Sequence, residues 1–171
     1  TLGTGVGGAI YSDGKLLRGH IGRAGHLGHI SLNANGSPDI IAIPGSLEDA
    51  IGECTLASRT HNQFSSTRQL VDEHIKGNAA ASTLWLSSVR ALACAIAGLI
   101  NVLDPEVVII GGGIAKAGRA LFEPLNAYLN EFEWRPAGNR VRIVPALLGD
   151  NAGAIGAAYH ALRESEKNAV S

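Results

Sequence analysis

The sequence has little of what marks a secreted, membrane-bound or nucleic-acid-binding protein. It has no methionine and only two cysteines, Cys54 and Cys94, which we expect to be buried thiols in a reducing compartment rather than a disulfide framework. Its 14 basic and 15 acidic residues give a net charge of −1, with no positive excess for nucleic acid or an anionic membrane. The longest apolar run, Ala91–Ile100, is shorter than the roughly 20 residues of a membrane span, and no signal peptide opens the sequence. We therefore expect a soluble, cytoplasmic protein.

The composition is that of one folded domain with an excess of glycine. Of the 171 residues 46% are hydrophobic, which excludes disorder. Glycine accounts for 22 residues, nearly twice its usual share of about 7%. No collagen-like period or Gly/Ser tract explains this excess, so the glycines must serve particular backbone positions.

The first half of the sequence predicts a hairpin followed by helices. Three strands are expected, with a turn at residues 12–14 between the first two: Gly5–Tyr11, Lys15–Leu17 and Gly28–Leu32. Ser46 is placed to cap a helix over Leu47–Arg59. Ser65 or Ser66 begins another helix, which ends at Gly77.

The second half alternates helices and strands. Apolar residues recur every three or four positions over Ala79–Leu103, which predicts a long amphipathic helix. Val107–Ile110 is typical of a strand buried on both faces. A helix over Leu121–Phe132, a strand over Val141–Val144 and a helix over Ala152–Arg163 follow. A hairpin followed by this alternation indicates an α/β layered domain with a mixed sheet and flanking helices.

Two glycine loops could hold an anion. Gly3–Gly8 fits the dinucleotide pattern G-x-G-x-x-G, but a hairpin follows it where that pattern needs a helix, so the dinucleotide interpretation is rejected. The loop is then either a phosphate cradle or a hairpin without a ligand. Gly111–Gly113 ends a strand and leads into a helix, which suits a phosphate or nucleotide as well as a simple tight turn. Two such loops in one domain favour a nucleotide.

Five stretches together resemble the ROK family of sugar kinases and sugar-responsive repressors, which have the actin-like ATPase (ribonuclease H-like) fold. In order along the chain they are Gly3–Gly14, Ala24–His29, Gly45–Glu48, Asn101–Gly113 and Gly153–Ala158. They match only the carboxyl-terminal lobe of such a kinase. The resemblance thus implies that residues 1–171 are that lobe. The amino-terminal lobe, with the first phosphate loop and the catalytic aspartate, is then absent from this chain.

The resemblance implies ATP and Mg²⁺ as cofactors and assigns the glycine loops to the nucleotide. It places the phosphates at Gly3, Thr4, Gly5 and Gly7, and the nucleoside at Gly111, Gly112 and Gly113. Thr4 could add a hydroxyl donor to a phosphate oxygen. No catalytic residue is expected in this chain, because the general base for the sugar hydroxyl would come from outside it, and the chain alone should be inactive.

The resemblance assigns the sugar to His26, His29 and Glu48. The family motif E-x-G-H stands here as His26-Leu27-Gly28-His29, so a neutral imidazole replaces a carboxylate and accepts a weaker hydrogen bond. His29 keeps its place, and Glu48 matches the last residue of the family's G-C-x-E segment. The alternatives are two loop histidines with local hydrogen bonds and a helix-start acid that the dipole favours.

We expect no structural zinc, although the family often carries one. The positions of its three cysteines are occupied by Asp39, Ile41 and Ser46, and an isoleucine cannot bind metal. The loop should then be held by its own apolar packing, through Ile40, Ile41, Ile43 and Pro44.

The leading hypothesis is the carboxyl-terminal lobe of an ATP-dependent sugar kinase, glucokinase-like and specific for a hexose, that forms a homodimer through this lobe. The alternative is the sugar-sensing lobe of a ROK-type transcriptional repressor, in which case nucleic acid would be a partner. A third hypothesis is a degenerate lobe that serves only for dimerisation. Trp85 and Trp134 are expected to anchor a core or a subunit contact.

Overall fold

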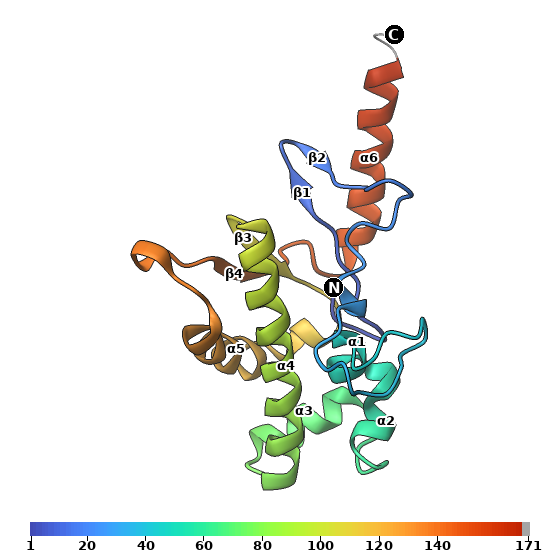
Figure 1. Cartoon of the computed structure of the whole chain (residues 1–171). Helices are drawn as coiled ribbons and strands as arrows, with labels where there is room; N and C mark the ends of the chain where they lie inside the picture. The colour runs from blue at the N-terminus through green and yellow to red at the C-terminus, as the bar shows by residue number, and fades with distance from the viewer. Residues whose placement is uncertain (169–171) are drawn as a thin grey trace.

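Helix α4 (Ala79–Leu103) is the central element of the computed structural model, which describes residues 1–168 (Figure 1). Its bounds are those that the apolar spacing predicts. The side chain of Asn78 caps its start by accepting a hydrogen bond from the N–H of Ala81 over 3.1 Å, and Asp104 ends it in the left-handed conformation, at φ 42°. By length and composition α4 could cross a membrane, the one such helix among the described residues. Its apolar face instead forms the protein core.

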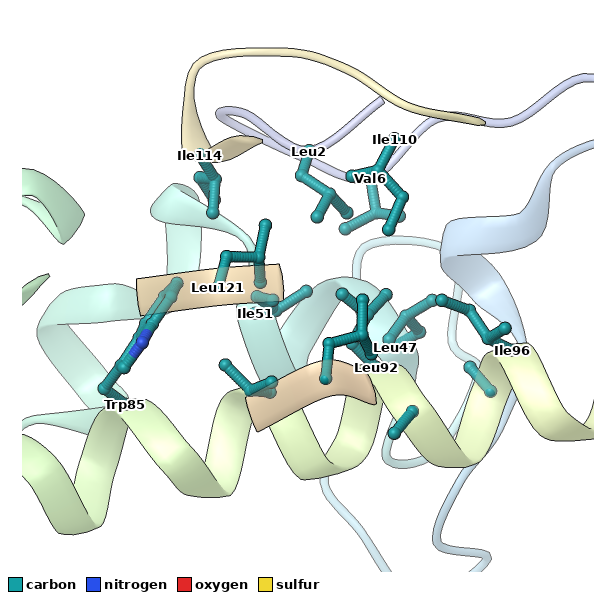
Figure 2. Packing of buried hydrophobic residues seen from close by; sticks show 14 of the residues in the cluster. Leu2, Val6, Leu47, Ile51, Trp85, Leu92, Ile96, Ile110, Ile114 and Leu121 are labelled. Atoms are coloured by element: carbon teal, nitrogen blue, oxygen red, sulfur yellow. The ribbon is translucent and has the colours of Figure 1, made fainter. Parts of the chain in front are cut away.

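The core lies between α4, α5 (Arg119–Phe132) and α1 (Leu47–Ile51). Trp85 is 1% exposed, and its indole N–H donates to the carbonyl of Ala120 over 2.8 Å, which confirms the expected core role of this tryptophan. Leu2 and Val6 from the first glycine loop enter the same cluster from the side opposite α4 (Figure 2). The loop is therefore anchored in the core at two points.

The described residues form two small sheets. Strands β1 (Tyr11–Ser12) and β2 (Lys15–Leu16) make the antiparallel hairpin, and β3 (Val107–Ile110) pairs in parallel with β4 (Arg142–Pro145). The mixed α/β class is confirmed. The expected burial of β3 on both faces is wrong: β3 has β4 as its one neighbour, and the side chain of Ile109 is 60% exposed.

Two other expected strands are much shorter or absent. Of Gly5–Tyr11 only Tyr11 belongs to a strand, because Leu2 and Val6 form an isolated bridge that folds the glycine loop back on itself. In place of a strand over residues 28–32, Leu27–His29 is a short 3₁₀ helix, η1. Gly28 lies so close to the carbonyl of Val6 that a Cβ there would collide with it, and this contact packs η1 against the glycine loop.

The predicted helix over residues 47–59 is interrupted at Gly52. Ser46 caps α1 as expected, accepting from the N–H of Asp49 over 3.2 Å. Gly52 is extended, at φ −60° and ψ 148°, and the chain resumes as η2 (Glu53–Thr55) and α2 (Leu56–Arg59). The break lets the N–H groups of Glu53 and Cys54 donate to the carbonyls of Gly3 and Thr4, over 3.0 and 2.8 Å. Lost helical bonds are thus replaced by bonds to the first glycine loop.

The remaining helices follow the sequence closely. Ser66 caps α3 (Thr67–Ile75) through the N–H of Gln69, and the chain then turns at Gly77, where φ is +85°. Three more 3₁₀ helices are η3 (Ile114–Ala117), η4 (Pro136–Gly138) and η5 (Gly149–Asn151).

Helix α6 (Ala152–Asn168) extends away from α4 beside the hairpin (Figure 1), and residues 152–163 are all exposed. Its apolar side chains Ile155, Tyr159 and Leu162 are 45%, 53% and 63% exposed.

Both cysteines are exposed, so the expectation of buried thiols is wrong. Cys94 lies between the buried Ala93 and Ala95, on the side of α4 that faces away from the core. Helical spacing turns position 94 outward although its neighbours are apolar.

Candidate functional site

The two glycine loops lie against each other, as the nucleotide hypothesis requires. The N–H of Leu2 donates to the carbonyl of Gly111 over 2.7 Å, and the N–H of Ile114 donates to the carbonyl of Leu2 over 3.0 Å. Gly112 has a φ of +92°, and a Cβ at this position would collide with the backbone of Leu2. Figure 2 shows Leu2 beside Ile110 and Ile114, which flank the second loop. The backbones of the two loops are therefore hydrogen-bonded to each other through Leu2 and form one continuous surface.

A cavity of about 750 Å³ opens beside this surface, with Gly3, Thr4 and Gly113 in its lining. This volume lies in the range of small-molecule sites. The other predicted nucleotide residues, Gly5, Gly7, Gly111 and Gly112, are not part of the lining. The remaining lining residues come from η2, α3 and η3: Glu53, Ser66, Thr67, Arg68, Val71, Asp72, Ile75, Ile114, Lys116 and Ala117.

The cavity combines bare backbone with cations and a buried hydroxyl. A Cβ placed on Gly3 or Gly113 would meet no atom within 4 Å, so the backbone at both positions is open to a ligand. Arg68 and Lys116 carry positive charge in the lining, but Glu53 and Asp72 carry negative charge there. Lys116 Nζ also lies 2.9 Å from Asp150 Oδ1. Thr67 Oγ1 is buried and has no hydrogen-bond partner among the described residues. The features that suit a phosphate-bearing ligand of nucleotide size are therefore the bare backbone and the unpaired hydroxyl, since the lining has two side chains of each charge sign.

Sequence reasoning missed the contribution of α3 to this cavity. The N–H of Thr67 donates to Glu53 Oε2 over 3.0 Å, which joins the start of α3 to η2 and so to the first glycine loop. The signal in the sequence was the cap at Ser66. That cap predicts where the helix begins, but it does not predict which distant loop the start of the helix contacts.

Glu48, predicted for the sugar, contacts the first glycine loop. Its Oε2 accepts a hydrogen bond from the N–H of Val6 over 2.8 Å, across 42 residues of sequence. The carboxylate lies directly over Gly5, where a Cβ would collide with it. Glu48 stands in the first turn of α1, as a helix-start acid would, but its side chain also reaches another segment. Its Oε1 has no partner among the described residues.

The two predicted sugar histidines lie side by side at η1. The rings of His26 and His29 are stacked, with centroids 6.3 Å apart. His26 is exposed and His29 is half-buried. Gly25, at φ +91°, packs against Gly8, and Gly28 packs against Val6, so the segment that carries both histidines lies along the glycine loop. The structure thus brings His26 and His29 together near the segment that Glu48 contacts.

Asp39 holds His29 and the loop that follows it. The distance from His29 Nδ1 to Asp39 Oδ2 is 2.7 Å, and Asp39 Oδ1 accepts from the N–H groups of Ile41 and Ile43 over 3.0 and 2.9 Å. The burial of Asp39 would raise its pKa, but these hydrogen bonds outweigh burial and lower the pKa to about 2. The expected apolar packing of this loop is wrong for Ile40 and Ile41, which are 87% and 56% exposed, whereas Ile43 and Pro44 are half-buried.

The residues at the zinc-motif positions do not fit a zinc site. Asp39 already accepts three hydrogen bonds through its two oxygens, and Ile41 offers no ligand atom. Among the side chains that the structure describes, no group of three or more His, Cys, Asp or Glu could hold a metal ion. The nearby Asp49, in the first turn of α1, has its pKa raised by burial and by the carboxylates of Asp39 and Glu48.

The ROK family model matches residues 1–164. The chain is 33% identical over 176 residues to a glucokinase of Thermotoga maritima, covering 92% of this chain and 55% of the relative. It is 31% identical over 161 residues to an N-acetylmannosamine kinase of Vibrio cholerae, covering 93% and 55%. The chain therefore spans about half the length of the curated relatives it matches.

Solved structures of ROK proteins also match this chain. A ROK hexokinase from Thermus thermophilus matches with a TM-score of 0.79 and 30% identity, over 96% of this chain and 57% of that one. A ROK glucokinase from Streptomyces griseus, in complex with glucose and AMPPNP, matches with a TM-score of 0.76 and 25% identity, over 92% and 57%. A ROK transcriptional regulator is less similar, with a TM-score of 0.69 and 25% identity over 84% and 40%.

Proposed function

Because this chain belongs to the ROK family and shares the actin-like ATPase fold of its sugar kinases, we propose that it is the carboxyl-terminal lobe of an ATP-dependent, glucokinase-like hexose kinase. The observation that carries the proposal is the position of the loop Gly3–Gly8. Gly3 and Thr4 line the cavity, while Val6 in the same loop binds Glu48. A phosphate at one end of this loop and a sugar hydroxyl at the other would lie close together.

We assign the nucleotide to the cavity and the two glycine loops. Gly3, Thr4 and Gly113 would contact it directly, and Gly5, Gly7, Gly111 and Gly112 would maintain the loop backbone. Bare amides and Arg68 would offset phosphate charge, which phosphoryl transfer needs more than covalent help, and Lys116 would have to leave Asp150 to do the same. ATP supplies the phosphoryl group. Mg²⁺ would bind mainly through phosphate oxygens, because the described side chains include no metal-binding group of three or more His, Cys, Asp or Glu.

We assign the sugar to Glu48, His29 and His26. A carboxylate accepts charge-assisted hydrogen bonds from sugar hydroxyls, and Glu48 is fixed by Val6 with one oxygen left over. His29 can accept one hydroxyl through its second ring nitrogen. His26 stacks on His29 and is the more exposed of the two, so it would contribute less.

The general base would come from a lobe that this chain does not include, so the chain alone should show no turnover. The exposed apolar side chains of α6, Ile155, Tyr159 and Leu162, support this proposal, because they offer a surface for further protein. We also propose a cytoplasmic homodimer formed through this lobe. The side chain of Trp134 is 73% exposed and suits a subunit contact.

A repressor lobe that senses sugar is the second candidate, favoured by the similarity to the ROK transcriptional regulator and by the loss of the motif glutamate at His26. The decisive experiment assays the intact protein that contains this chain for ADP release with a panel of hexoses and amino sugars. We expect sugar-dependent ADP release, which His29→Ala should shift to higher sugar concentration. ATP binding without turnover on any sugar would contradict the kinase proposal and favour the regulator.

A further inference from the structure

Asp39 is a buried carboxylate whose two oxygens bind two different parts of the site. Its side chain is 0% exposed. Oδ1 accepts from the N–H groups of Ile41 and Ile43, and Oδ2 lies 2.7 Å from Nδ1 of His29. Both oxygens are therefore bound, and the carboxylate has no exposed surface for a ligand.

The contacts of Oδ1 give the loop after Asp39 its shape. The N–H of Asp39 donates to the carbonyl of Ile43 over 2.9 Å, and the N–H of Ala42 donates to the carbonyl of Asp39 over 2.9 Å. Ala42 adopts a positive φ of 66° to close this turn. The turn leads to Ser46, which caps α1, the helix that carries Glu48. Asp39 thus joins His29 to the start of α1.

The contact of Oδ2 decides which ring nitrogen of His29 carries a proton. An ionised carboxylate only accepts hydrogen bonds, so Nδ1 of His29 must donate. In a neutral imidazole the other nitrogen, Nε2, is then an acceptor. The low pKa of Asp39 keeps its carboxylate ionised at neutral pH. The His29 side chain is 17% exposed, so Nε2 is the ring nitrogen available to a ligand.

We propose that Asp39 is a positioning residue that fixes His29 with its proton on Nδ1 and leaves Nε2 to accept a sugar hydroxyl. This inference rests on the proposed sugar site. Asp39 stands where the resemblance places the first zinc cysteine, and Ile41 and Ser46 stand at the other two. The carboxylate would therefore hold this loop by hydrogen bonds, where a metal-bound loop would be held by thiolates.

The pairing can be tested on the 171-residue chain by ¹H–¹⁵N NMR of the histidine rings, with the His29 signals assigned by their loss in His29→Gln. We expect the wild type to show a protonated Nδ1 and an unprotonated Nε2. In Asp39→Asn the amide oxygen can still accept from the backbone while its NH₂ donates to Nδ1, which moves the ring proton to Nε2. Asp13→Asn, an exposed turn substitution, is the matched control and should leave the His29 signals unchanged. A wild type protonated on Nε2 would overturn the pairing, and this measurement on the wild type does not depend on the folding of Asp39→Asn.

The positioning role is tested in the intact protein. Asp39→Asn should raise the sugar KM by about tenfold or more and leave the ATP KM within about twofold, the usual effect of removing a partner that orients a ligand-binding histidine. If His29→Ala raises the sugar KM and Asp39→Asn does not, Asp39 has no positioning role. If His29→Ala itself has no effect, the proposed sugar site is wrong, and the NMR result still reports separately on the pairing.

Discussion

The carboxylate of Glu48 accepts a hydrogen bond from the backbone N–H of Val6, with 2.8 Å between Oε2 and N, and lies directly over Gly5. This contact joins the first turn of α1 to the first glycine loop. It also explains one of the glycines, because any side chain at position 5 would displace the carboxylate.

Gly5→Ala should therefore destabilise the chain by about 1–2 kcal/mol, since it weakens a hydrogen bond to a charged acceptor. Chemical denaturation of the 171-residue chain measures this change. Gly7→Ala is the matched control in the same loop, because a Cβ at position 7 meets no atom within 4 Å. Its effect on the free energy of unfolding should stay below about 0.5 kcal/mol. Equal effects of the two substitutions would show that the contact between Gly5 and Glu48 carries no energy.

Glu48→Gln should separate sugar binding from stability. The glutamine oxygen can still accept from Val6, so the fold is kept, but the charge that strengthens hydrogen bonds to a hydroxyl is lost. In the intact protein we expect a rise in the sugar KM of about tenfold, with the ATP KM little changed. Glu123→Gln, an exposed glutamate of α5, is the control. A sugar KM that does not move would remove Glu48 from the sugar site.

Gly113→Val tests the nucleotide cavity. Gly113 has ordinary helical dihedral angles, φ −60° and ψ −39°, and free space around its Cβ position, so valine fits the backbone but occupies part of the cavity. The ATP KM of the intact protein should rise by about tenfold, the equivalent of about 1.4 kcal/mol of binding. Gly98→Val, which adds the same side chain on the exposed face of α4, should leave it unchanged. An unchanged ATP KM in Gly113→Val would place the nucleotide elsewhere.

The sequence predicted best those elements whose signals are local. The bounds of α4 follow from its apolar spacing and from Asp104-Pro105, and the caps at Ser46 and Ser66 are formed by the residues themselves. The strand over residues 28–32 was wrong because Gly28 packs against Val6, a contact that no local pattern contains. The break at Gly52 has the same cause, since the bonds that replace the helix go to Gly3 and Thr4.

The candidate site was also predicted only in part, because motif positions are local signals and long-range contacts are not. Motif positions predicted Gly3, Gly113 and Glu48 for the site, and the structure brings the two glycine loops together and Glu48 to the first of them. Asp39 was considered only as a position that had lost a cysteine. Its role as a hydrogen-bond acceptor for His29 depends on the conformation of the nine residues between them, which residue types alone do not reveal.

Absence of zinc is a prediction that can be checked directly. Purified protein should contain well below one equivalent of zinc by elemental analysis, and treatment with EDTA should leave its melting temperature unchanged. The reason is that Asp39 and Ile41 replace thiolate ligands, without which a closed zinc site is weak. One equivalent of bound zinc, with a melting temperature that falls on chelation, would contradict the assignment of Asp39 to hydrogen bonding.

Acid should remove the contribution of Asp39 to stability. The pKa of Asp39 is lowered in the folded chain, from 3.8 to about 2, so its ionised form is favoured by folding. Such a group stabilises the fold fully above its unfolded pKa, and the contribution is lost as the pH falls through the folded value. The titratable groups that face Asp39 are His29 and Asp49. Both are kept in Asp39→Asn, so a comparison of wild type with this variant isolates the Asp39 carboxylate. The wild type should melt at a higher temperature near neutral pH, and the difference should shrink between about pH 4 and about pH 2. A difference that stays constant over this interval would mean that the Asp39 carboxylate is not stabilised by the fold.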